Sequence, residues 1–230
     1  MKYGAGALPS TYDPRDYWYE PLDRGGFDWK KGFDIEDVLG HKLVVKDQNG
    51  SGSCGGQAWS YYGEVLESIN TNDYEPRSAR WIYAHTHAPT GGSGGKENSA
   101  FVCKHGFALE AHATSYENGK PPTEEFMVKV PALTQEALEI ADMSRGRTYL
   151  KVAPNIDLIA QAIYDNNGVI LSVSGEDNGT WRTEFPKPPK NKVWNHWLYA
   201  GKVKIINKRK YIGVLNSWGT KTGDEGWQWI

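Results

Sequence analysis

A single cysteine at the end of a glycine-rich loop constrains this chain more than any other feature of its sequence. A short apolar run ending at Val45 leads into a loop rich in glycine and serine, residues 49–56, which carries Cys54. Beyond Cys54 the apolar residues recur at the spacing of one helical face: Ala58, Tyr62, Val65, Leu66 and Ile69. The sequence therefore predicts a helix that begins at an exposed thiol. A helix N-terminus favours the thiolate and lowers the thiol pKa.

Three polar residues could complete a nucleophilic site around this thiol. Gln48 lies six residues before Cys54, and its side-chain amide could donate a hydrogen bond to an oxyanion forming beside the sulfur. A nucleophilic cysteine also needs a base, and the base needs an orienting partner. His196 opens a β-patterned run, and a predicted turn over residues 207–210 returns the chain to Asn216. The hairpin predicts that Asn216 lies close to His196.

These motifs resemble the active-site motifs of the papain-like cysteine peptidases. The similarity covers most of the chain, from about residue 27 to residue 230. The matching segments are Asp47-Gln48, Gly52-Ser53-Cys54, Asn195-His196, Asn216-Ser217-Trp218-Gly219 and Gly223-Asp224-Glu225-Gly226-Trp227. By that resemblance Cys54 is the nucleophile, His196 the general base and acid, Asn216 the group that orients the imidazole, and Gln48 the oxyanion donor. Trp218 would shield the His-Asn hydrogen bond from water.

The chain departs from the family pattern at three places. Gly55-Gly56 stand where the family commonly has Trp-Ala after the nucleophile. Thr222 replaces a second family tryptophan, and this change alters the leaving-group side of the cleft. Ser51 stands at the position of the family's usual disulfide cysteine.

The resemblance implies an α+β protein with a papain-like two-subdomain fold. A helical N-terminal subdomain and a β-barrel-like C-terminal subdomain would hold the active site in the cleft between them. Helical patterns come first in the chain and strand patterns later, which is consistent with this class. We expect an N-terminal arm over residues 1–25, a helical subdomain with the nucleophile helix over 26–120, and a β-rich subdomain with the histidine and asparagine over 121–230. A short strand is expected over residues 148–152.

A second group of residues is expected to bind substrate. The glycine-rich segment 91–95 resembles the family's substrate-binding glycines, whose backbone pairs with an extended peptide like an added strand. A flexible linker is an equally good interpretation of this segment. Alternation along a strand places Trp194 on the face of His196 and Trp197 on the opposite face, so Trp194 is the better cleft candidate. The predicted substrate-binding residues are Gly94, Gly95, Trp194, Asn195 and Trp218.

The N-terminal arm, residues 1–25, is rich in tyrosine, proline, aspartate and glycine. It is too short and too poor in helical pattern to resemble the long helical propeptide of the family. Two interpretations remain open: a structural strap, which is the favoured one, or an arm that lies across the cleft. The arm could also contact a protein partner in an assembly.

Composition restricts the remaining function classes. A net charge of -2 gives no electrostatic reason to expect nucleic acid or an anionic membrane as a partner. No signal-peptide pattern opens the chain, and no apolar run is long enough to span a membrane. If Cys54 is a nucleophile, Cys103 has no partner for an intramolecular disulfide. This fits a reducing compartment, either the cytoplasm or the inside of an assembly such as a particle.

The function expected from these motifs is a cysteine endopeptidase-type hydrolase that acts on a peptide or protein substrate. No cofactor is expected, and no metal either, because His85 and His87 lack a further ligand at useful spacing. Two alternatives stay open: a catalytically retired papain-like module that binds within a larger assembly, and an acyl-transferring transpeptidase, which the same triad could support.

Overall fold

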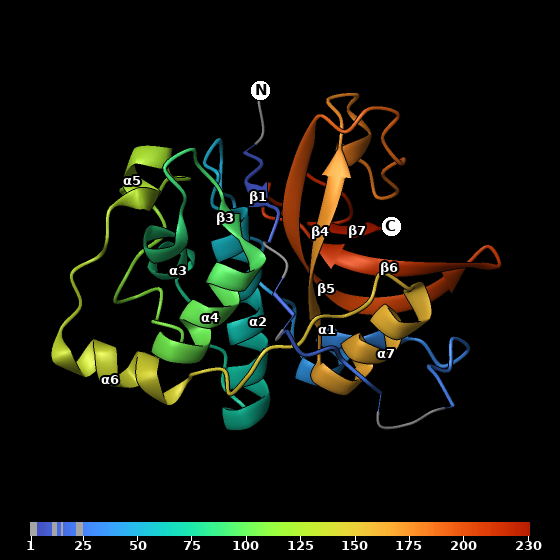
Figure 1. Ribbon diagram of the computed structural model, residues 1–230, viewed down its shortest axis with the longest axis horizontal. Helices are drawn as coiled ribbons and strands as arrows, with labels where there is room; N and C mark the ends of the chain where they lie inside the picture. Colours follow the sequence, from blue (N-terminus) through green and yellow to red (C-terminus); the bar gives the residue numbers. More distant parts are fainter. Residues whose placement is uncertain (1–3, 11–12, 15, 22–24) are drawn as a thin grey trace.

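The computed structural model describes residues 4–10, 13–14, 16–21 and 25–230. Helices form one side of the molecule and a curled antiparallel sheet forms the other (Figure 1). The helices of the first side are α2 (Cys54–Thr71), α3 (Ala79–Thr86), α4 (Gly95–His105), α5 (Glu124–Val128) and α6 (Gln135–Met143). Between the two sides, β1 (Ala7–Leu8) pairs in parallel with β3 (Ser93–Gly94).

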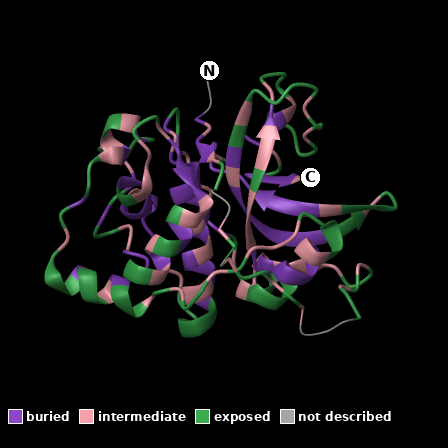
Figure 2. Cartoon of the chain, viewed as in Figure 1, coloured by how far each residue is buried: buried purple, intermediate pink, exposed green. Residues whose placement is uncertain are grey.

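The central helix α2 begins at the cysteine, as the apolar spacing predicts. It packs against α3 on one side and against the sheet on the other, so most of its first half is buried (Figure 2). Asn72 caps its C-terminal end, where a left-handed φ of 57° lets the Asn72 backbone N–H bond back to the Ser68 carbonyl. The helix therefore fixes Cys54 at the boundary between the two sides of the molecule.

The sheet is organised around one long strand, β5 (Trp194–Ile206). This strand pairs antiparallel with three others: β4 (Val169–Gly175), β6 (Arg209–Leu215) and β2 (Phe33–Asp34). β7 (Trp227–Trp229) adds to the outer edge of β6. Three shorter elements complete the fold: α1 (Ile35–Leu39), α7 (Ile156–Asn166) and a 3₁₀ turn over Thr180–Arg182.

The β5–β6 hairpin is tighter than the sequence suggests. We expect a turn over 207–210, but β6 already begins at Arg209, and only Asn207 and Lys208 form the turn. Both have positive φ, 49° and 65°, as a two-residue turn requires when its twist matches that of the strands. The strand expected over 148–152 is wrong, because among the described residues only Lys151 of this segment makes a bridge, to Trp18, and no described strand extends that pairing.

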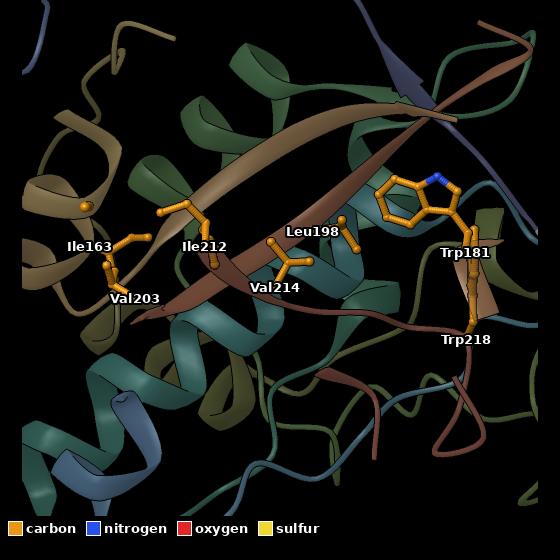
Figure 3. Close-up of a cluster of buried hydrophobic side chains, with 9 residues drawn as sticks. Ile163, Trp181, Leu198, Val203, Ile212, Val214 and Trp218 are labelled. Carbon is orange, nitrogen blue, oxygen red and sulfur yellow. The ribbon is translucent and has the colours of Figure 1, made fainter. Parts of the chain in front are cut away.

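The largest hydrophobic core lies on the sheet side, beneath α7. Aliphatic side chains of β5 and β6, including Leu198 and Val214, pack with Ile163 of α7 (Figure 3). Trp181 and Trp218 lie together at the other end of this cluster, toward the candidate site (Figure 3).

Within the described residues, no helix is both long and apolar enough to cross a membrane.

Candidate active site

Cys54, the first residue of α2, is completely buried. Burial raises the pKa of the Cys54 thiol to about 11, although backbone amides of Trp197 and Gly6 are directed at the sulfur and favour the thiolate. The expectation of an exposed thiol with a lowered pKa is wrong for this conformation. The helix N-terminus is present as predicted, but the cost of removing a thiolate from water outweighs its effect.

His196 and Asn216 lie together, as the hairpin predicts. His196 Nε2 is 2.9 Å from Asn216 Oδ1, and both residues are fully buried. The backbone N–H of Ser217 donates to the same Oδ1 at 2.8 Å. Burial lowers the pKa of His196 to about 4, against the opposite effect of the Asn216 hydrogen bond. The imidazole is therefore neutral at pH 7.

Trp218 covers this pair. Its ring centroid lies 4.6 Å from that of His196, with the planes tilted by 32°. Trp194 packs edge-on against Trp218 with 5.6 Å between the ring centroids. The two indoles form an apolar wall beside the imidazole, the position that the resemblance gives to Trp218.

Gln48 is joined to the segment that follows Asn216. Its backbone N–H donates to the Ser217 carbonyl at 2.9 Å, and its Oε1 accepts from Ser217 Oγ at 2.6 Å. Its Nε2 donates to Ser51 O at 2.6 Å and to Gly4 O at 3.2 Å. The donor expected to hold an oxyanion is thus bonded to two backbone carbonyls of the chain.

A buried ion pair joins the loop of Gln48 to α2, the helix that begins at Cys54. Lys46 Nζ lies 2.6 Å from Glu64 Oε1 on α2, and both side chains are almost fully buried. The same Glu64 oxygen accepts the backbone N–H of Arg77 at 2.9 Å. This network joins the segment just before Gln48 to the middle of α2, the helix that begins at Cys54.

The described start of the arm, residues 4–8, lies across the site. Gly4 O accepts hydrogen bonds from Gln48 Nε2 and from Trp218 Nε1, each at 3.2 Å. Gly6 O accepts from Ser93 N at 2.8 Å. The described part of the arm therefore lies across the segments that carry Gln48 and Trp218, as the second of the two interpretations expects, and the Gly6 amide contributes to the surroundings of the sulfur.

Glycine is required at both arm positions that approach the site. A Cβ on Gly4 would lie 1.8 Å from Ser51 O, and a Cβ on Gly6 would lie 2.1 Å from Gly52 O. Real Cβ atoms do not approach carbonyl oxygens so closely. The fit leaves no space for a side chain between the arm and the loop that carries Cys54.

Farther along, salt bridges hold the arm to the body of the protein. Lys96 of α4 bonds Asp13 at 2.6 Å and Asp16 at 3.2 Å, and Lys151 also bonds Asp16. The backbone of Tyr19 bonds that of Lys151. The arm is thus anchored both at the site and at a distance from it.

The predicted substrate-binding residues lie near the arm. Gly94 pairs with Leu8, which shows an extended segment adding to the glycine-rich edge, so this segment is not a flexible linker. Trp194 and Asn195 line an open hollow of about 890 Å³ beside the arm. A Cβ on Gly95 would lie 2.8 Å from the Trp197 ring.

Sequence reasoning missed several residues of this site. Trp197 reaches the glycine segment from β5, where its Nε1 donates to Ser93 O at 2.9 Å, although alternation had made it the weaker cleft candidate. Ser217 holds Gln48, and Gln228 holds Asn216. One signal for the close contact of the arm was available in the sequence: Gly4-Ala5-Gly6, where the small residues allow a close approach to another segment.

Within the described ranges, no cluster of three metal-ligating side chains occurs.

Comparisons with known proteins find similarity at the level of structure alone. No family model and no curated protein sequence matches the chain. Xylellain, a cysteine protease from Xylella fastidiosa, superposes with a TM-score of 0.79 at 20% identity, covering 99% of this chain and 89% of its own. Procathepsin B S9 from Trypanosoma congolense gives 0.74 at 10% identity, covering 99% and 80%.

Bromelain from Ananas comosus, solved in complex with the inhibitor E64, gives a TM-score of 0.59 at 21% identity and covers 86% of this chain and 87% of its own. The three proteins have the same arrangement of a helical side and a curled antiparallel sheet. The chain therefore has the papain-like fold, an α+β architecture with a helical half and a β half-barrel.

Proposed function

We propose that this chain is a cysteine endopeptidase-type hydrolase that uses Cys54, His196, Asn216 and Gln48. The observation that carries the proposal is the buried His196–Asn216 hydrogen bond on a strand whose next backbone amide, that of Trp197, is directed at the Cys54 sulfur. His196 Nδ1 is buried and has no hydrogen-bond partner among the described residues. A ring nitrogen without a partner, one residue along the strand from the Trp197 amide, is available as a general base for that thiol.

In the proposed reaction the Cys54 thiol gives its proton to His196 and the thiolate attacks the carbonyl carbon of a peptide bond. Gln48 Nε2 and the backbone N–H of Cys54 donate to the oxyanion that forms. The imidazolium then gives its proton to the leaving amine, and an acyl-enzyme remains. Water, deprotonated by His196, attacks the thioester, which releases the acid and restores the thiol.

The way the arm is held supports a peptide as the class of substrate. Ala7 and Leu8 pair with β3 through backbone contacts, so this edge accepts an extended peptide. The hollow beside the arm, lined by Trp194, Asn195 and the segment 87–92, leaves room for side chains on that side. An extended peptide or an unfolded protein segment fits this arrangement.

Catalysis requires the arm to leave. Gly4 occupies the Gln48 donor, and Cys54 is completely buried while the arm is in place. A substrate carbonyl and the Gly4 carbonyl cannot both accept from Gln48 at the same position. The structure therefore corresponds to a closed state, and the peptidase activity belongs to an open one.

The closed site also fits the alternative of a catalytically retired binding module, because a protein whose cleft is permanently occupied would not turn over substrate. A reactive probe separates an active peptidase from such a module. We would treat the full chain and a variant carrying both Gly4→Ala and Gly6→Ala, termed the open variant, with a peptidyl vinyl sulfone. Expected is labelling of the open variant at Cys54, with none in the same variant carrying Cys54→Ala. A folded open variant that is never labelled would reject the peptidase.

Turnover itself is tested by incubating the open variant with a library of unstructured peptides. Cleaved products are expected, and their sequences give the side-chain preference. An added amine nucleophile tests the transpeptidase alternative, since a transferase would form amide products in preference to acids. The Cys54→Ala form of the open variant is the matched control for both measurements.

A further inference from the structure

Gln228, on β7, is fully buried directly beside the candidate triad. Its Oε1 accepts a hydrogen bond from Asn216 Nδ2 at 2.8 Å. Its Nε2 donates to two backbone carbonyls, those of Trp181 at 2.9 Å and Thr183 at 3.0 Å. All of its hydrogen bonds are therefore made inside the protein, and one of them reaches the residue that orients His196.

The chemistry of these partners determines which way both amides face. Backbone carbonyls only accept, so the group of Gln228 that faces Trp181 and Thr183 has to be the NH₂. Its oxygen then faces Asn216, and an oxygen accepts only from the NH₂ of that amide. Asn216 Oδ1 is consequently left for His196 Nε2, in agreement with the Ser217 N–H that donates to the same oxygen.

The protonation of the imidazole follows from this order. Asn216 Oδ1 can only accept, so His196 Nε2 carries the proton of the neutral ring. The other nitrogen, Nδ1, keeps its lone pair, and it is the nitrogen without a partner among the described residues. Hydrogen bonds thus link the backbone carbonyls of Trp181 and Thr183 to Gln228, Gln228 to Asn216, and Asn216 to His196.

We propose that Gln228 is a positioning residue that holds the Asn216 amide in one orientation and so fixes His196 in its Nε2-protonated form. The expected effect on turnover rests on the proposed function, but the protonation of the His196 ring can be measured without any activity. Gln228 contributes through Asn216, because the direct contact to the imidazole belongs to Asn216. Ser217 N–H supports the same orientation, so loss of Gln228 weakens the preference without removing it.

A merely structural role is the competing explanation, because a buried glutamine also satisfies two carbonyls. Gln228→Met keeps the length of the side chain and removes both amide groups. Gln161→Met is the matched control, since Gln161 is another buried glutamine, bonded to Asp165 on its own helix at 2.8 Å. If Gln228 has only a structural role, Gln228→Met and Gln161→Met should both leave the protonation of His196 unchanged.

The first measurement is the ¹⁵N spectrum of the histidine rings in the full-length protein, for wild type, Gln228→Met and Gln161→Met at neutral pH. We expect His196 to be Nε2-protonated in wild type and in Gln161→Met. In Gln228→Met the Nδ1-protonated form should become detectable, because the Asn216 amide can then turn its NH₂ toward the ring. An unchanged His196 spectrum in folded Gln228→Met would overturn the proposal.

The second measurement is kcat and KM in the open variant, with and without Asn216→Ala. Gln228→Met should lower kcat roughly tenfold, the effect of losing one buried hydrogen bond, and leave KM unchanged. In the Asn216→Ala background the same substitution should have no further effect on kcat. Equal losses in both backgrounds would contradict a role through Asn216. If no variant turns over, the proposed function fails while the ring spectra still decide the role of Gln228.

Discussion

The carbonyl oxygen of Gly4 accepts a hydrogen bond from Nε2 of Gln48 at 3.2 Å. Gln48 is the donor that the proposed mechanism assigns to an oxyanion, and Gly4 belongs to the chain's own N-terminal arm. The two roles of Gln48 exclude each other, so the arm and a substrate compete for one position. Displacement of the arm should therefore control every reaction of Cys54.

Gly6→Ala should open the site. The new Cβ would lie 2.1 Å from Gly52 O, and relieving such an overlap typically costs about 1–3 kcal/mol, which is roughly a 5- to 150-fold shift in an equilibrium. The rate of alkylation of Cys54 by iodoacetamide at pH 7 should increase by a factor in that range. Mass spectrometry of the peptide that contains Cys54 measures this rate.

The pH profile of the same reaction reports the thiol directly. Burial holds the pKa of Cys54 at about 11 in the closed state, so exposure to water should move the profile of Gly6→Ala to lower pH. Pro9→Ala is the control, because Pro9 is exposed and the change adds no atom near the sulfur. Equal rates and profiles in wild type and Gly6→Ala would show that the arm does not limit access.

Asn216→Ala should reduce turnover of the open variant without abolishing it. Asn216 orients the imidazole through one hydrogen bond and does not react, so a residual activity about a hundredfold below the parent is expected. Steady-state kinetics on a cleaved peptide measure this. Complete loss in a protein that keeps its circular dichroism spectrum would contradict an orienting role.

Glu64→Gln should destabilise the fold. The change leaves Lys46 as a buried charge without its partner, which typically costs about 3 kcal/mol or more. Urea unfolding at pH 7 gives the free energy, with exposed Glu136→Gln on α6 as the control. A loss no larger than that of the control would show that the pair contributes little.

Folding stability should fall between pH 7 and pH 5 because of His196. Its pKa is about 4 when buried and 6.5 in the unfolded chain, so over this range the unfolded state takes up a proton that the folded state does not. The expected loss is about 2 kcal/mol. It should shrink in His196→Gln and persist in His112→Gln, whose histidine is exposed. Equal pH dependence in all three proteins would refute the shift.

The helix at Cys54 and the hairpin that brings Asn216 to His196 could both be predicted from the sequence. The first shows in the apolar spacing after the cysteine, and the second in two strand patterns with a turn between them. These signals are local, because each needs only the residues of one element and its immediate neighbours. The strand expected over 148–152 failed for the complementary reason: a strand also needs a partner, and its own residues do not say whether one is present.

The sequence by itself determined which chemical groups the chain carries and the order in which its elements present them. Only the tertiary structure decided that Gly4 and Gly6 pack against the loop that carries Cys54, that burial raises the thiol pKa against the helix N-terminus, and that Gln228 reaches Asn216. Each of these depends on contacts between segments far apart in the sequence. The burial of a side chain and the direction of its hydrogen bonds depend on all of these contacts together, so no local sequence pattern encodes them.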